Sequence, residues 1–232
     1  MRKFCLIGGM GPQATMLYYN LIISKYRSLV STENYPEFMI INLDLYLVDQ
    51  FMERRDYSGL ADYLLKALHR AYQDGAEFAA MVANTPHQVF PELAEVSPLK
   101  LISIVEATCR RAGKQNLNKS LLLGTKYTMQ LDFYPSAMSE YGIEIVVPSI
   151  EEQKYIHRKI FDELDKGLIL DHTRDGFLGI INQIAENQNI DSVILGCTEI
   201  PLVLTEKDIK NLVVLDTARI HVDEIVDEML AK

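Results

Sequence analysis

The sequence predicts an α/β protein built from two similar domains, each a parallel β-sheet with helices on both faces. Short apolar runs of strand length alternate with longer segments of helical periodicity, the pattern of such folds. Several of the apolar runs end at a glycine, as at Gly8, Gly124 and Gly196. Matching features also recur about half a chain apart: Leu6-Ile7-Gly8 resembles Leu122-Leu123-Gly124, and Ala83-Asn84-Thr85 lies in the position of Cys197-Thr198-Glu199.

The recurrence indicates two domains related by a pseudo-twofold axis, with an active site in the cleft between them. We expect an N-terminal domain over residues 1–116 and a C-terminal domain over residues 117–232. The polar stretch 114–119 is the candidate hinge. The final helix, residues 217–232, is a candidate for packing back on the first domain.

In the first half, apolar runs predict four strands, at residues 3–8, 38–44, 78–82 and 99–104. A glycine-rich turn follows the first strand, and Pro12 suits the first turn of the helix after it. Residues 46–56 are expected to form a loop. Ser58 is expected to cap a helix that ends at Gly75.

The second half repeats this plan. Its strands are expected at residues 120–124, 143–147, 192–196 and 212–216. Helices are expected at about 128–140, 150–164 and 172–188, with a last helix closing the chain.

Composition excludes several classes of function. A net charge of −9 argues against a nucleic-acid partner, because nucleic-acid binding depends on neutralising phosphates. No apolar run approaches the roughly 20 residues that cross a bilayer, so no membrane partner is expected. The apolar stretch near the N-terminus breaks too early for a secretion signal, which favours a cytoplasmic protein. The three cysteines are widely spaced, and their pattern predicts neither a metal site nor a disulfide framework.

Cys197 is the strongest candidate for chemistry. It follows an apolar run that ends at Gly196, and parallel sheets bind their ligands beyond the carboxyl ends of such strands. We expect Thr198 to begin a helix, whose N-terminus would lower the pKa of the thiol from about 8.5. The alternative is that Cys197 is a small buried hydrophobic residue, the commonest fate of a free cysteine.

Four motifs in order resemble those of the aspartate/glutamate racemase family, most closely its bacterial L-aspartate/glutamate-specific members. The likeness runs over nearly the whole chain. The motifs are Gly8-Gly9-Met10, Asn84-Thr85-Pro86-His87, Gly124-Thr125-Lys126-Tyr127-Thr128-Met129 and Gly196-Cys197-Thr198-Glu199.

The resemblance implies a racemase that uses no cofactor, neither pyridoxal phosphate nor a metal. In that family two cysteines flank the α-carbon of an acidic amino acid; one removes the α-proton and the other protonates the opposite face. Cys197 matches the second cysteine. The positions that the resemblance assigns to substrate binding are Met10, Asn84, Thr85, Thr125 and Thr198, with Arg54 a weaker match near the side-chain carboxylate of the substrate.

Residue 83 departs from the family pattern, because Ala83 stands where the first catalytic cysteine is expected. A methyl group transfers no proton, so the two-base reaction is not open to this chain. Three interpretations remain: an engineered Cys→Ala variant of a racemase; a one-thiol relative, such as a decarboxylase or isomerase; and a dicarboxylate-binding protein without turnover.

Two further residues are candidates for supporting roles. His87 could act near residue 83 or could cap a neighbouring group, since histidine titrates near neutral pH. Glu199 could orient Cys197 or cap its own helix. The expected small-molecule partner is a diacid such as aspartate or glutamate. The resemblance also implies a homodimer, because members of the family are usually dimeric.

Overall fold

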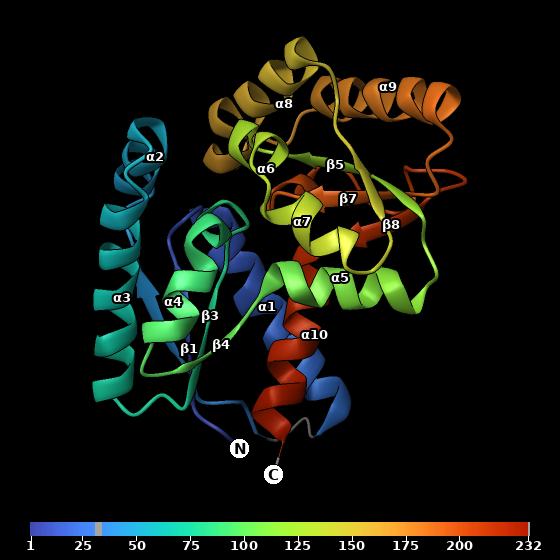
Figure 1. Cartoon of the computed structure of the whole chain (residues 1–232). Helices are drawn as coiled ribbons and strands as arrows, with labels where there is room; N and C mark the ends of the chain where they lie inside the picture. The colour runs from blue at the N-terminus through green and yellow to red at the C-terminus, as the bar shows by residue number, and fades with distance from the viewer. Residues whose placement is uncertain (31–33, 232) are drawn as a thin grey trace. The chain divides into compact units, whose positions relative to one another are not determined.

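Two four-stranded parallel sheets form the centre of the structure, which confirms the predicted fold class. This computed structural model describes residues 1–30 and 34–231. The chain folds into two compact units: unit 1 comprises residues 1–104 and 218–232, and unit 2 comprises residues 105–217. The strand order is β2-β1-β3-β4 in unit 1 and β6-β5-β7-β8 in unit 2, so the two sheets repeat one topology (Figure 1).

Unit 1 contains the first four strands and the helices that connect them. Its elements are β1 (Phe4–Gly8), α1 (Pro12–Leu29), β2 (Met39–Asn42), α2 (Leu45–Arg54), α3 (Tyr57–Gln73), β3 (Phe78–Met81), the 3₁₀ helix η1 (Thr85–Val89), α4 (Phe90–Val96), β4 (Lys100–Ile102) and α10 (Thr217–Leu230).

Unit 2 contains the other four strands. Its elements are α5 (Ile104–Lys114), β5 (Lys119–Gly124), α6 (Lys126–Gln130), α7 (Phe133–Ser139), β6 (Glu144–Val146), α8 (Ile150–Asp162), η2 (Leu164–Lys166), α9 (Asp171–Gln188), β7 (Ser192–Gly196), η3 (Ile200–Leu202) and β8 (Val213–Asp216).

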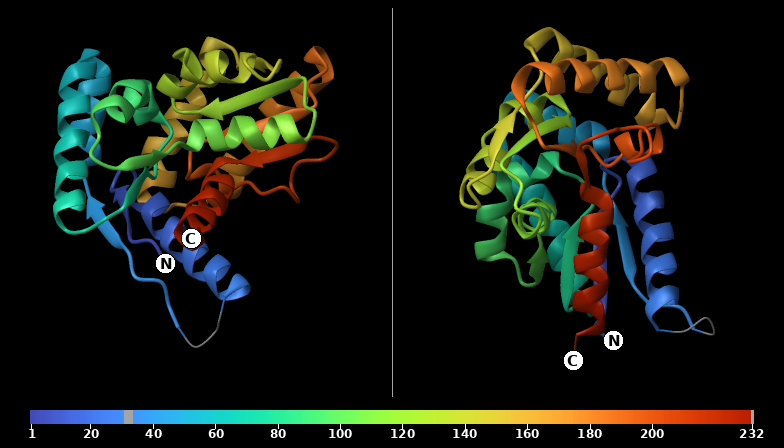
Figure 2. Two further views of the ribbon diagram at one scale, coloured as in Figure 1. Left: turned by 60° about the horizontal axis from the view of Figure 1, so that its bottom comes forward. Right: turned by 90° about the vertical axis from the view of Figure 1, so that its right-hand side faces the viewer.

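The central strands of the unit 1 sheet, β1 and β3, are buried on both faces, as is typical of a parallel sheet, whereas the edge strands β2 and β4 are partly exposed. Alternate residues of β1 point to opposite faces, and all five are buried. Phe4 and Leu6 share one core with Tyr18 and Ile22 of α1 and with α10. Helix α3 covers the other side of the strands, so the sheet lies between α1 and α10 on one side and α3 on the other (Figures 1 and 2).

The sheet of unit 2 is sandwiched in the same way. Leu121 and Leu123 of β5 pack with Ile156 of α8 and Phe177 of α9 in one core. Helices α5 and α7 lie on the opposite side of the strands (Figure 1). Every residue of β7 is buried, which explains why its sequence reads as an unbroken apolar run.

The units divide the chain at Ile104, earlier than the boundary at residue 116 that we expected. Helix α5 groups with unit 2, where Gly113 lies against the ring of Tyr141. Helix α10 groups with unit 1: Val222 and Val226 are buried in the core that contains Phe4. The backbone N–H of Arg2 also donates to the carbonyl of Met229, at 3.0 Å.

Three local predictions were wrong. Residues 46–56 do not form a loop, because the Asp44 side chain caps helix α2 and the helix buries Val48 and Met52 on one face. Asp56, rather than Ser58, caps α3, with Oδ1 accepting from the N–H of Gly59 at 2.9 Å. The single helix expected at 128–140 is two short helices, α6 and α7.

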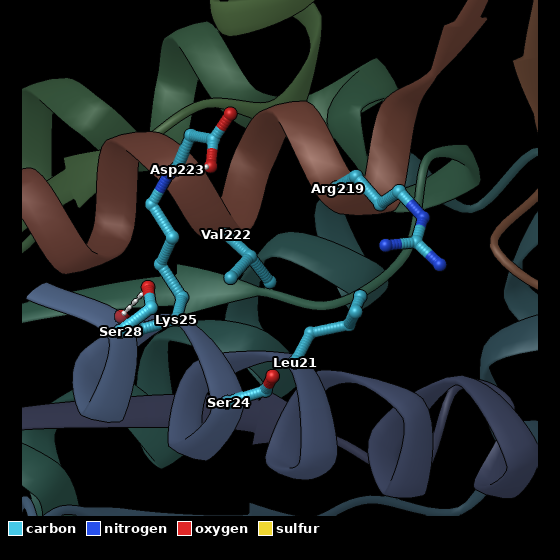
Figure 3. A pocket seen from close by; sticks show the side chains of 7 residues that line it. All are labelled: Leu21, Ser24, Lys25, Ser28, Arg219, Val222 and Asp223. Carbon is cyan, nitrogen blue, oxygen red and sulfur yellow. Dashed lines mark hydrogen bonds and ion pairs between the residues drawn. The ribbon is translucent and has the colours of Figure 1, made fainter.

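A shallow groove runs between α1 and α10 in unit 1, with a cavity of about 190 Å³. Leu21 and Val222 form its apolar floor, and the ion pair between Lys25 and Asp223, at 2.8 Å, closes one end (Figure 3). None of the candidate site residues lines this groove. Among the residues described, no helix combines the length and apolar character needed to cross a membrane.

Candidate functional site

Cys197 lies immediately beyond β7, a central strand of unit 2, at the edge of the sheet where ligands bind in such folds. Its side chain is buried, with 6% of its surface exposed. No α-helix follows it, contrary to our expectation. The chain instead enters η3, a single three-residue 3₁₀ turn, after the carbonyl of Cys197 accepts from the N–H of Ile200 at 3.1 Å.

The environment of Cys197 raises the pKa of its thiol well above its usual value, the opposite of our prediction. Burial is the main cause, and the negative charges of Glu199 and Asp165 add to it. The backbone N–H of Glu199 lowers the pKa but does not offset these effects. The short η3 turn supplies little of the helix field on which the prediction depended. These surroundings therefore favour the thiol of Cys197 over the thiolate.

Glu199 is the polar partner of both residues before it. Its Oε2 atom accepts a hydrogen bond from Cys197 Sγ at 3.1 Å and another from Thr198 Oγ1 at 3.0 Å. Only 2% of Glu199 is exposed. Of the two roles we considered, the geometry matches orientation of the thiol, because Glu199 makes no side-chain bond that caps η3.

Thr125 occupies the end of β5, the strand beside β7. Gly124 and Gly196 pair in register, so the residues that follow them, Thr125 and Cys197, leave neighbouring strands at the same edge. Thr125 Oγ1 accepts from the N–H of Thr128 at 3.2 Å and caps α6. A methyl group added at Gly124 would lie 2.8 Å from the carbonyl oxygen of Gly196, so glycine permits this close approach.

Ala83, Asn84 and Thr85 occupy the equivalent position after β3 in unit 1. Ala83 and Asn84 are buried, while Thr85 is half-buried and begins η1. Both β3 and β7 therefore end in a short 3₁₀ turn that contains a proline. The side chain at residue 83 is a methyl group where residue 197 carries a thiol.

His87 ties the ends of β3 and β4 together. Its Nδ1–H donates to the carbonyl of Ala83 at 2.9 Å, and its Nε2 accepts from the backbone N–H of Ile104 at 3.2 Å. Burial lowers the pKa of His87 to about 3, with a further contribution from His221. His87 is neutral at physiological pH, and both ring nitrogens bond the backbone, so its geometry matches the capping role.

Met10 lies in the glycine-rich turn after β1, next to the end of β3. It is buried, and the turn is held by Thr15, whose Oγ1 accepts from the N–H of Gly9 at 2.8 Å. Gly9 has a φ of 84°, where a side chain would strike the backbone of Leu43. Met10 therefore joins Ala83 and Asn84 at one edge of the unit 1 sheet.

Arg54 does not join this group. It lies in the last turn of α2, and its side chain is exposed. Helix α2 starts near the end of β2, so Arg54 is roughly 14 Å along the helix from that edge. The loop that we expected to carry Arg54 is in fact this helix.

Three structurally important residues received no role from the sequence. Thr128 packs against both strand-end glycines, and Asp165 acts on Cys197 electrostatically. His221 accepts from Tyr18 Oη at 2.9 Å and donates to the carbonyl of Ile102, also at 2.9 Å. Thr128 lies inside the glycine-threonine motif that follows β5, but the roles of Asp165 and His221 depend on contacts between distant parts of the chain.

The other cysteines do not supply a second thiol to the site. Cys5 lies within β1 and Cys109 within α5; both are buried, and burial raises their pKa values to about 11 and about 12. Within residues 1–30 and 34–231, no group of histidine, cysteine and acidic side chains is arranged to hold a metal ion.

Comparison with known proteins gives a consistent result. Residues 7–225 match the profile of the Asp/Glu/hydantoin racemase family. The chain is 22% identical over 203 residues to the broad specificity amino-acid racemase RacX of Bacillus subtilis, covering 86% of each. It superimposes on an aspartate racemase homologue from Pyrococcus horikoshii with a TM-score of 0.84 and 35% identity, covering 98% of this chain and 99% of that one. A Yersinia pestis protein classed with the Asp/Glu racemases gives a TM-score of 0.88 and 30% identity over the full length of both chains.

Proposed function

Because the chain belongs to the Asp/Glu/hydantoin racemase family, we propose that it acts on the α-carbon of an acidic amino acid and that Cys197 is the residue that transfers the proton. The observation that carries the proposal is the position of Cys197: a thiol at the end of a central strand, hydrogen-bonded to a buried carboxylate. RacX of Bacillus subtilis, a racemase of broad specificity, supports amino acids as the substrate class.

The remaining candidate residues are proposed to bind the substrate. Hydroxyl and amide groups can hold the α-carboxylate and α-amine and can stabilise the negative charge that develops when the α-proton leaves. The reaction is proposed to need no pyridoxal phosphate. The proposed binding residues are Met10, Asn84, Thr85, Thr125 and Thr198. Arg54, which is exposed in the last turn of α2, is left out of this set.

Ala83 limits what the chain can do. Racemisation needs proton transfer on both faces of the α-carbon, and a methyl group provides none. We therefore propose that Cys197 exchanges the α-proton of one enantiomer with solvent, while net racemisation is slow. This behaviour is compatible with the first two interpretations of Ala83: an engineered Cys→Ala variant of a racemase, and a one-thiol relative.

Restoring the missing thiol tests the proposal. In Ala83→Cys, racemisation of L-aspartate or L-glutamate should rise by roughly 100-fold or more, the usual size of one acid–base contribution. Chiral chromatography measures the rate. Ala83→Ser is the matched control, because a hydroxyl is of similar size but is far more weakly acidic. A racemisation rate in Ala83→Cys no higher than in Ala83→Ser would contradict the two-base scheme.

A single-cysteine decarboxylase is the second candidate, and the raised pKa of Cys197 favours it. A thiol that stays protonated at neutral pH suits protonation of a carbanion left by loss of CO₂. This function predicts CO₂ release from a substituted malonate without any change at Ala83. Tight binding of a dicarboxylate without turnover, even in Ala83→Cys, would instead indicate a binding protein.

The proposal includes a homodimer, the assembly that the family resemblance implies. The chain mass is 26.4 kDa, so light scattering distinguishes a dimer from a monomer directly. A monomer at the protein concentration used for the activity assay would contradict this part of the proposal.

A further inference from the structure

One edge of the unit 1 sheet differs from the other sheet edges in its charge. Among the described strands, β2 lies at the end of the order β2-β1-β3-β4 and pairs with β1 alone. The strands at the other three edges each contain an ionisable residue: Lys100 in β4, Glu144 in β6 and Asp216 in β8. Strand β2, Met39–Asn42, contains none. Because charges on edge strands hinder pairing with another chain, β2 is the edge with the least protection against it.

The register of β2 directs part of its backbone to the outer edge. The N–H of Leu43 donates to the carbonyl of Gly8, in β1, at 2.9 Å. Successive residues of a strand direct their backbone groups to opposite sides, so the N–H and C=O groups of Asn42 and Ile40 point away from β1. A strand placed beside this edge can therefore continue the sheet.

Apolar side chains flank this edge on the face of the sheet that α1 covers. Ile40 pairs with Leu6, which shares a core with α1, so Ile40 lies on the same face. Phe38, two residues earlier, contacts Tyr19 of α1, with 5.8 Å between ring centroids. Met16 precedes Tyr19 by one helical turn. Met16, Tyr19 and Ile40 are 53%, 49% and 40% exposed, and together with Phe38 they form what we call the β2-edge patch.

The chemistry of this surface fits a second copy of the chain. Exposed apolar patches mark protein–protein contacts. Because each chain has a net charge of −9, two copies repel each other over much of their surface. The residues of β2 and of the β2-edge patch carry no charge, so two copies can meet there without this cost. A fitting partner presents an uncharged strand edge beside an apolar helix face, and β2 and α1 of a second copy present both.

We propose that β2 and the β2-edge patch form the interface of a homodimer. In this dimer β2 pairs antiparallel with β2 of the second copy, so the two four-stranded sheets of unit 1 become one eight-stranded sheet. A twofold axis makes such a contact self-complementary, since the same residues meet from both sides. Met16 and Tyr19 cover the junction on the α1 face. The inference rests on the homodimer of the proposed function and adds the surface that forms it; it is independent of the reaction at Cys197.

Ile40→Lys in the full-length protein tests the interface, because it brings two cations together across the twofold axis. Sedimentation velocity at several protein concentrations should show a dimer for the parent and a dissociation constant raised by about 100-fold or more in the variant. Val96→Lys is the matched control: Val96 is 59% exposed, lies at the end of α4 outside the patch, and should leave the dissociation constant unchanged. Tyr19→Glu, on the surface of α1, is the second variant if Ile40→Lys prevents folding, and it should also weaken the dimer.

Amide hydrogen exchange tests the pairing of the strands. The N–H of Asn42 points to the outer edge, so its exchange in the dimeric parent should be slower than in monomeric Ile40→Lys by at least about 10-fold. The N–H of Leu43 is the internal control, because it bonds to Gly8 in both states. Its exchange should change much less than that of Asn42.

The outcomes separate this inference from the rest of the proposed function. A parent that is monomeric would overturn both the interface and the homodimer, and would leave the patch to a different protein or to a lipid surface. A dimeric parent whose dissociation constant is unchanged in Ile40→Lys and in Tyr19→Glu would overturn the interface and keep the homodimer. A weakened dimer with an Asn42 N–H that is unprotected in the parent would overturn the strand pairing. A dimer with this interface but without α-proton exchange would overturn the proposed reaction alone.

Discussion

The ends of β3 and β7 share a backbone plan but carry different side chains. Each strand is central in its sheet and runs into a 3₁₀ turn that contains a proline. After β7, the thiol of Cys197 donates a hydrogen bond to the carboxylate of Glu199 at 3.1 Å. After β3, a methyl group is followed by His87, a neutral ring whose two nitrogens bond backbone atoms. The comparison shows that the two strand ends keep one backbone plan, while only the end of β7 carries a thiol beside a carboxylate.

The largest effect should come from removing the thiol. Cys197→Ala should lower α-proton exchange with L-aspartate or L-glutamate by about 1,000-fold, within the range for loss of an acid–base group. Proton NMR in deuterated buffer follows the exchange. Cys109→Ala is the control, since this buried cysteine lies within α5. Equal losses in the two variants would mean that the difference between the two strand ends has no catalytic meaning.

Removing His87 should expose its structural role. In His87→Leu the carbonyl of Ala83 and the N–H of Ile104 lose a buried partner, so the free energy of unfolding should fall by about 2–4 kcal/mol at pH 7. Urea unfolding measures the change. A loss of exchange activity without a loss of stability would instead show that His87 takes part in the chemistry.

The same variant should alter acid sensitivity. The folded-state pKa of His87 is about 3, below the 6.5 of the unfolded chain, so its contribution to stability is full above pH 6.5 and declines as the pH falls toward 3. The slope approaches about 1.4 kcal/mol per pH unit for one proton. In His87→Leu this slope should disappear. The contribution of His157, whose pKa burial lowers to about 4, remains in both proteins. His69→Gln, the replacement of an exposed histidine, is the control.

Replacing the strand-end glycines should lower stability by a smaller amount, and the two units should respond differently. A methyl group at Gly124 meets backbone, the carbonyl of Gly196, whereas one at Gly8 meets the side chain of Thr15 at 2.7 Å. Each alanine variant should cost about 1–3 kcal/mol. Adding Thr15→Ala should restore much of the stability lost in Gly8→Ala. Adding Thr128→Ala should restore less of the stability lost in Gly124→Ala. Thermal unfolding of the four single and two double variants measures the stability that is recovered. Equal recovery in the two units would contradict the expected difference between Gly8 and Gly124.

The smallest effects should come from the ion pairs outside the strand ends. Lys25 and Asp223, in the groove of unit 1, are about one-third exposed (Figure 3). Lys159 and Glu163 of unit 2 are more buried, and Glu163 also bonds Thr173. Lys25→Met should cost less than about 1 kcal/mol, and Lys159→Met more. Chemical unfolding at low and high salt measures both. A larger loss in Lys25→Met would reverse the ranking that burial predicts.

The sequence predicted the sheets well because their signal is local. Each of the eight strands in the described residues overlaps an apolar run of the sequence, and the half-chain recurrence predicted the repeated topology. Helix α2 was missed because its exposed charged end, Glu53 to Arg55, resembles a loop when its capping residue Asp44 is overlooked. The sequence does not indicate that α5 groups with unit 2, because the packing of this helix depends on residues such as Tyr141, which lie in a later element.

The electrostatics of the site was less predictable than its position. The sequence indicated that Cys197 follows a buried strand that ends at Gly196, and it lies immediately beyond β7. The direction of its pKa shift depends on burial, on the rotamer of Glu199 and on Asp165, none of which a sequence pattern specifies. The role of His87 likewise depends on its bond to Ile104, in another element.

The contribution of α10 to unit 1 has a consequence for biosynthesis. Val222, Ile225 and Val226 fill the core beside β1, yet they follow the whole of unit 2 along the chain. When β4 has just emerged from the ribosome, the hydrophobic core beside β1 therefore still lacks the residues of α10. Unit 2 is continuous in sequence and can mature first, while the first half waits for its last helix and is exposed to chaperones and proteases in the interval.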